Sequence, residues 1–210
     1  MDSLSNLPMI GVGFLALLIS ITLRLWAKAW LMDRLGDPTP RLTGRVSMNP
    51  FDHFDMVGTL LIPILFLLYV STPPVYGWGK HIYSHPSAFA KPARDEILVS
   101  LIGSIMNLVA AFLIAFLGGF LIKSQPSTAS LIDLLVQQNI LLAVFSLLPV
   151  PPLDGAVIVK HIFRMSEEAF YRYSQWSLVL FIAIILIKPL SLIINVPYAI
   201  FYTMAWHLMF

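Results

Sequence analysis

The sequence predicts an all-α membrane protein, a polytopic bundle of five to six transmembrane helices in a single domain covering residues 1–210. The chain is 58% hydrophobic and 11% charged, whereas an average soluble domain carries roughly 25% charged residues. Uncharged apolar stretches long enough to cross a bilayer recur along the chain. The net charge of +2 is too small to indicate nucleic-acid binding, and the absence of cysteine excludes disulfides and thiolate metal sites.

We predict spans at about residues 8–32, 57–72, 97–122, 134–148, 173–187 and 190–210. The first begins at a proline, which suits the start of a helix, and the turn residues Gly36-Asp37-Pro38 follow it. Weak alternation over 44–48 predicts a short extended loop after this helix. Pro73-Pro74 ends the second span, and Lys188-Pro189 interrupts the last apolar region, which gives either five or six spans.

A proline-broken segment, LLPVPPLDG at 147–155, ends the fourth span. Its prolines remove backbone donors and forbid a continuous helix. Irregular backbone at membrane depth persists only inside protein or beside a wet cavity, so the break is expected to face the bundle interior. The residues that follow, 156–170, predict an amphipathic helix at the interface.

Asp154, at the end of this segment, has two interpretations. It either caps a helix end in an Asp-Gly turn at the interface or lies inside the bundle, where ionisable residues are functional candidates. Arg24 and Lys28 are four residues apart and share one helix face. They either snorkel to the headgroups, flanked by Trp26 and Trp30, or point inward at a buried acid.

The histidines give a weak metal signal. His81 and His85 have the i, i+4 spacing of a metal pair, but they lie in a loop and no glutamate stands beside them. His53 lies beside two aspartates and is interpreted as a surface or interfacial residue. An alternative metal site would combine these three histidines with Asp154.

Four stretches in order resemble the site-2 protease family of intramembrane zinc metalloproteases. They are Arg34–Pro63, Gly77–Lys80, Arg94-Asp95 with Gly103 and Asn107, and the segment from Asn139 to Gly155. The resemblance covers roughly residues 17 to 164. It implies a zinc site made of His-Glu-x-x-His on one helix and a distant Asp, with the Glu as general base.

Counting back from Gly36-Asp37-Pro38 places the first His of this motif on Arg24, the Glu on Leu25 and the second His on Lys28. Asp154 alone remains of the implied metal ligands. Ser104 stands where the family has Pro, and Ser146 where it has Asn. Because an arginine side chain cannot ligate zinc and leucine cannot move a proton, the resemblance implies a fold and a site location without implying hydrolysis. We hypothesise that Arg24 or Lys28, or both, supply Asp154 with the positive charge that zinc would give.

The resulting prediction is a non-catalytic membrane protein, without zinc, that binds or scaffolds other integral membrane proteins as a subunit, assembly factor or regulator. Its expected location is the lipid bilayer of a bacterial inner (plasma) membrane. An intramembrane metalloprotease with an altered metal site, and an ion or proton pathway lined by Arg24, Lys28 and Asp154, are the alternatives. By family analogy, the partner contact is expected at Gly103, Asn107, Asn139, Pro149, Pro151 and Pro152.

Overall fold

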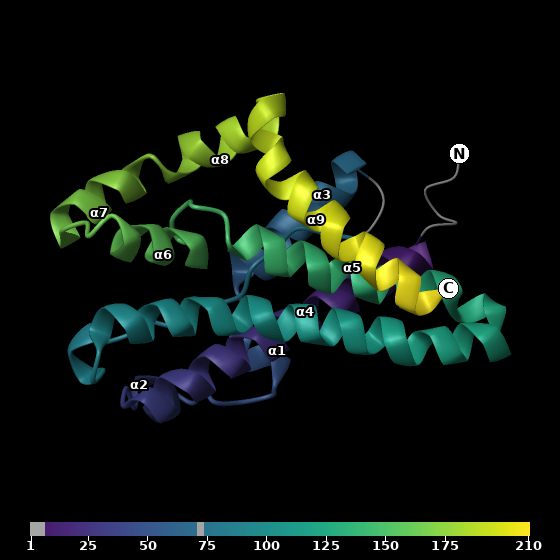
Figure 1. The fold of residues 1–210 in the computed structure, drawn as a ribbon, viewed down its shortest axis with the longest axis horizontal. Helices are drawn as coiled ribbons and strands as arrows, with labels where there is room; N and C mark the ends of the chain where they lie inside the picture. Colours follow the sequence, from purple (N-terminus) through teal and green to yellow (C-terminus); the bar gives the residue numbers. More distant parts are fainter. Residues whose placement is uncertain (1–6, 71–73) are drawn as a thin grey trace.

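The computed structural model describes residues 7–70 and 74–210, and this part of the chain is helical and contains no strand. Its longest helix, α4 (Pro92–Ser124), runs along the length of the bundle (Figure 1). Helix α1 (Leu7–Leu35) packs against α4, while α5 (Ala129–Ser146) and α9 (Lys188–Met209) cover another side of it (Figure 1). The helical class predicted from composition is therefore confirmed.

Within residues 7–70 and 74–210, four helices are long and apolar enough to cross a membrane, so the chain is an integral membrane protein. The candidate spans belong to α1, α4, α5 and α9 and are Ile10–Leu35, Pro92–Ser124, Pro126–Ser146 and Leu192–Met209. The third of these includes the 3-10 turn Pro126–Thr128 that precedes α5.

The described residues thus contain four candidate spans, where five to six were predicted from the sequence. In the 57–72 region a π-helix, Met56–Leu61, leads into α3 (Ile62–Val70), and the continuous apolar stretch is too short to span. Residues 71–72 of that predicted span lie outside the described residues. The 173–187 region is divided between α7 (Glu167–Gln175) and α8 (Ser177–Leu186). The ten residues of α8 rise only about 15 Å, half the bilayer core.

The predicted amphipathic helix over 156–170 is also broken. Helix α6 (Asp154–Ile162) ends before Arg164, which adopts the left-handed φ of 48°, and α7 starts after the capping residue Ser166. Helices α6, α7 and α8 form an arm that leaves one end of the bundle and returns through α9 (Figure 1).

The connection after α1 contains short helices and irregular backbone. Helix α2 (Thr39–Leu42) is followed by residues 44–48, where a short extended loop was predicted and the backbone is irregular. A 3-10 turn, Pro50–His53, then leads to the π-helix, and another, Pro86–Ala88, precedes α4. The loop 74–85 returns over this region, where the Trp78 and Lys80 N–H groups donate to the Gly58 and His53 carbonyls at 3.1 and 2.9 Å. This pairing holds the loop against the 3-10 turn and the π-helix, beside the candidate site.

Candidate functional site

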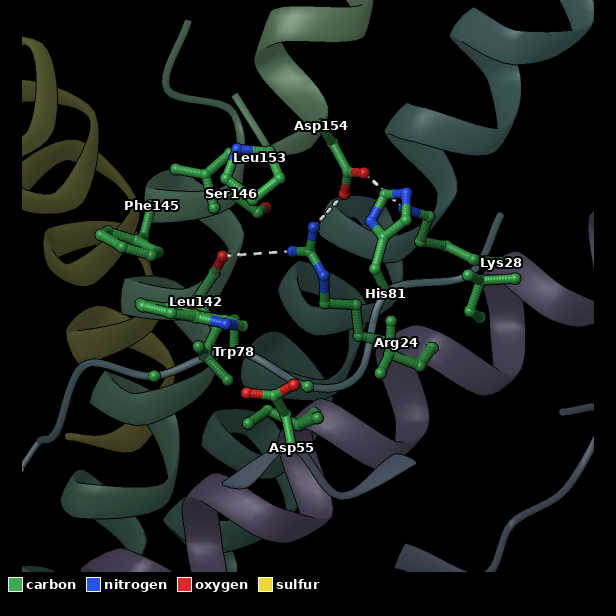
Figure 2. Close-up of a pocket in the computed structure, with 16 residues that line it drawn as sticks. Arg24, Lys28, Asp55, Trp78, His81, Leu142, Phe145, Ser146, Leu153 and Asp154 are labelled. Carbon is green, nitrogen blue, oxygen red and sulfur yellow. Dashed lines mark hydrogen bonds and ion pairs between the residues drawn. The ribbon is translucent and has the colours of Figure 1, made fainter. Parts of the chain in front are cut away.

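The site is built from two side chains of α1 and the first residue of α6. Arg24 and Lys28 lie one turn apart, and each binds a different oxygen of the Asp154 carboxylate (Figure 2). The Arg24 Nη1 also donates to the Leu142 carbonyl oxygen at 3.4 Å. All three charged residues are buried, with 9%, 7% and 5% of their surfaces exposed for Arg24, Lys28 and Asp154. Residues 130 positions apart in sequence thus form one interior charge cluster.

A glycine allows this approach. A Cβ atom on Gly103 of α4 would lie 2.8 Å from Arg24 Cγ and 3.3 Å from Lys28 Cδ. The bare backbone of α4 therefore gives the aliphatic stems of both cations room to cross it towards α6. Glycine is used here for space and not for an unusual backbone conformation.

The cluster carries a local positive charge, because two cations share one carboxylate. Removing charges from water costs several kcal/mol per ion, and the cost is repaid only by close, hydrogen-bonded pairing. Here both carboxylate oxygens are used. Truncation of Asp154 would leave both cations without their partner, whereas truncation of either cation would leave Asp154 paired with the other.

A cavity of about 130 Å³ lies beside the cluster, lined by Arg24, Leu25, Lys28, Asp154 and residues of the 77–82 loop. Asp55 also lines it, facing the cluster from the start of the π-helix (Figure 2). An apolar groove of about 160 Å³ adjoins this cavity. The two share four wall residues, Trp78, Phe145, Pro152 and Leu153. No local sequence pattern connects Asp55 to Arg24, so its place in the cavity was not predicted from the sequence.

A second cavity, of about 400 Å³, also borders the cluster and shares Lys28, His81, Ile82 and Asp154 with the first. Its wall includes Glu96 of α4, whose carboxylate is 2.5 Å from His161 Nε2 of α6 and accepts from the Ser84 hydroxyl at 3.3 Å. These contacts fasten the far end of the helix that begins at Asp154. Sequence reasoning missed Glu96 because the predicted span began just after it.

The histidines of the alternative metal site are dispersed. His53 is buried and its Nε2 lies 2.7 Å from the Ser47 carbonyl oxygen. Burial lowers the pKa of His53, and so keeps this imidazole neutral at pH 7. His85 Nδ1 lies 3.0 Å from the Thr39 hydroxyl, whereas His81 lines the cavity that contains Asp154. His53 is therefore interior, against the predicted surface or interfacial position.

The side chains around Asp154 do not fit the zinc ion that the family uses. Arginine has donors and no acceptor, and a charged lysine ammonium has no lone pair to offer a metal. One carboxylate falls short of the three protein ligands of a catalytic zinc site. Within residues 7–70 and 74–210, no group of three His, Asp or Glu side chains could hold a metal. We therefore assign no metal chemistry to this cluster.

The predicted partner-contact residues divide into two sets. Gly103, Asn107 and Asn139 are buried, and both side-chain polar atoms of Asn107 lack a hydrogen-bond partner. In contrast, Pro151 and Pro152 line the apolar groove, and the Pro149 carbonyl accepts from the Tyr173 hydroxyl. The groove is thus the accessible part of the predicted contact, and the two asparagines lie inside the bundle.

The cavity loop is tied to α5 by a side chain that sequence reasoning also missed. The Gln138 amide accepts from the Val75 N–H and donates to the Val75 carbonyl, each at 2.9 Å. Both residues are fully buried, with 0% exposure. The Gln138 amide therefore satisfies both backbone polar groups of Val75, as the backbone of a neighbouring strand would.

Replacing Gln138 with leucine is expected to lower the free energy of unfolding by about 1–3 kcal/mol, because it leaves buried backbone groups of Val75 unpaired. Thermal unfolding in detergent measures the loss, and faster proteolysis within 74–82 reports the freed loop. Gln175→Leu, at an exposed position of α7, is the control and should stay within about 0.5 kcal/mol of the parent. Equal effects of the two substitutions would contradict the role assigned to Gln138.

Comparison with known proteins identifies relatives. The chain is 32% identical over 154 residues to "Putative zinc metalloprotease YwhC" of Bacillus subtilis, with 70% of this chain and 66% of that protein covered. This similarity, added to the helical fold and the position of Asp154, decides the family. The chain belongs to the site-2 protease family.

Further members of the site-2 protease family match over more of the chain. "Putative zinc metalloprotease Rip2" of Mycolicibacterium smegmatis is 27% identical over 195 residues, which cover 90% of this chain and 72% of that protein. Rip2 of Mycobacterium tuberculosis is 28% identical over 180 residues, covering 83% and 66%. The chain spans about two thirds of the length of YwhC. No protein-family profile and no solved structure matches the chain.

Proposed function

We propose that this protein is a non-catalytic member of the site-2 protease family that binds other integral membrane proteins, as a subunit, assembly factor or regulator in a bacterial inner membrane. The observation that supports the proposal is the binding of both Asp154 oxygens by Arg24 and Lys28. The cations occupy the carboxylate that would otherwise hold a metal. The groove beside them keeps a surface on which an apolar segment can lie.

An altered metalloprotease site is the second candidate, because His81 lines the cavity that contains Asp154. A metal there would need Asp154 to leave its two cations and would gain a single imidazole. Such a site supplies fewer ligands than catalytic zinc uses. Binding a metal in this way would break both buried ion pairs of Asp154, so we favour the binding function.

The test is to solubilise the membranes gently, purify the protein, and measure both the co-purifying membrane proteins and the zinc content of the same sample. We expect a defined membrane partner at a reproducible ratio and no stoichiometric zinc. Ser177→Trp, at a residue that lines the groove, should reduce the amount of co-purifying partner. Stoichiometric zinc that is lost on Asp154→Ala would contradict the proposal and favour the metalloprotease.

A further inference from the structure

The charge cluster indicates the chemistry of the partner. Resting on the proposed binding function, we propose that the bound membrane segment carries an Asp or Glu whose carboxylate enters the cavity and binds Arg24. Arg24 and Lys28 bring two positive charges to one carboxylate inside the bundle. A carboxylate from a partner would balance the excess, and buried charges are stable when they are paired and hydrogen-bonded.

The cations keep hydrogen-bonding capacity for such a group. A guanidinium has five N–H donors and an ammonium three. Among the described residues, the hydrogen bonds of Arg24 are one to Asp154 and a long one, 3.4 Å, to the Leu142 carbonyl, while Lys28 binds Asp154. Both side chains line the cavity. An incoming carboxylate can therefore accept from Arg24 without displacing Asp154.

Asp55 is the other carboxylate of the cavity, and it does not neutralise the cluster directly. Its Oδ1 accepts from the Val57 and Gly58 N–H groups at 3.0 and 2.6 Å, so it is engaged at the start of the π-helix. In Figure 2 it lies on the opposite side of Arg24 from Asp154. Among the described ion pairs within 4 Å, neither cation is joined to it.

The groove favours a protein segment over a lipid headgroup. The groove walls are apolar and include Val150, Pro151 and Leu153, which suit aliphatic side chains. The cavity of about 130 Å³ has room for one acidic side chain, with its neighbours on the same segment lying in the groove. An acid inside a membrane segment is itself costly and needs a cationic partner. The cavity and groove of this protein are thus complementary to an acidic membrane segment in charge as well as in polarity.

The experiment measures binding of synthetic membrane helices to the purified protein in phosphatidylcholine nanodiscs at pH 8. The probes are labelled leucine–alanine helices of about 20 residues that differ at one central position, Asp, Asn or Leu. Energy transfer to a labelled protein gives the affinity. We expect the Asp helix to bind at least about tenfold more tightly than the Asn helix, as close interfacial charge pairs do.

Lys28→Gln tests the charge argument, because it leaves the Arg24–Asp154 pair and removes the excess charge. It should abolish the preference for Asp while keeping the binding of the Leu helix, which shows that the groove is intact. Lys160→Gln is the control: Lys160 binds Glu167 at 2.7 Å and lines the second cavity. This control should keep the preference.

The outcomes separate this inference from the function on which it rests. If all three helices bind equally, the binding function stands and the acidic partner is wrong. If no helix binds, the binding function itself fails. Displacement of the Asp helix by added phosphatidylglycerol would overturn the choice of a protein carboxylate over a lipid phosphate.

Discussion

Asp154→Ala is expected to destabilise the protein by about 3–5 kcal/mol, the usual cost of removing one partner from a buried ion pair. The substitution leaves Arg24 and Lys28 buried with no carboxylate between them. Because α6 begins at Asp154, the loss should also loosen the arm that this helix starts. Unfolding in detergent micelles, followed by heat or denaturant, measures the change.

Two variants determine whether charge is the cause. Glu167→Ala also removes the carboxylate partner of a lysine, but the Glu167 side chain is 82% exposed, so a loss of no more than about 1 kcal/mol is expected. Replacing Arg24 and Lys28 with methionine in the Asp154→Leu background should recover much of the stability, since an apolar cluster of similar volume avoids the desolvation cost. If Asp154→Ala is as stable as the parent, the cluster does not hold the fold together.

The combined substitution Arg24→His, Leu25→Glu and Lys28→His is expected to create a zinc site holding about one metal ion per chain. Histidines four residues apart lie on one helix face. In the structure both positions already point their side chains at Asp154, and Leu25 lines the same cavity. The donors missing from the present cluster would thus be supplied where the carboxylate lies.

Elemental analysis of the purified variant and of the parent measures this gain. Adding Asp154→Ala to the three substitutions should remove the zinc, because two imidazoles then lack the third protein ligand. Stoichiometric zinc in the parent would mean that the cations do not replace the metal. A folded triple variant without zinc would mean that the motif positions were assigned incorrectly.

The long spans were predictable, and the short ones were not. The uncharged runs that became α1, α4, α5 and α9 are long enough to specify membrane helices by composition alone. The 57–72 and 173–187 regions are just as apolar, yet π-helical backbone and the break at Trp176 divide them. Hydropathy records the burial of side chains and contains little information about where the backbone hydrogen-bond pattern changes.

The position of the site was predictable because the resemblance to the site-2 protease family, counted back from Gly36-Asp37-Pro38, placed Arg24 and Lys28 opposite Asp154. Its other charged residues were not predictable in this way. Asp55, Glu96 and His161 come from segments with no shared pattern. Asp55 lines the first cavity, and Glu96 contacts His161, only because of how the connecting segments and α6 pack in the fold.

The sequence by itself determined that this is a membrane protein of helices and that it resembles the site-2 proteases, and the resemblance predicted which residues stand at the positions of the zinc motif. Those properties depend on composition and spacing, which are local or countable along the chain. Only the tertiary structure decided that both cations bind the same carboxylate, that Gly103 makes room for them, and that Gln138 secures the cavity wall. Such contacts join residues far apart in the chain, and their geometry follows from how the helices pack.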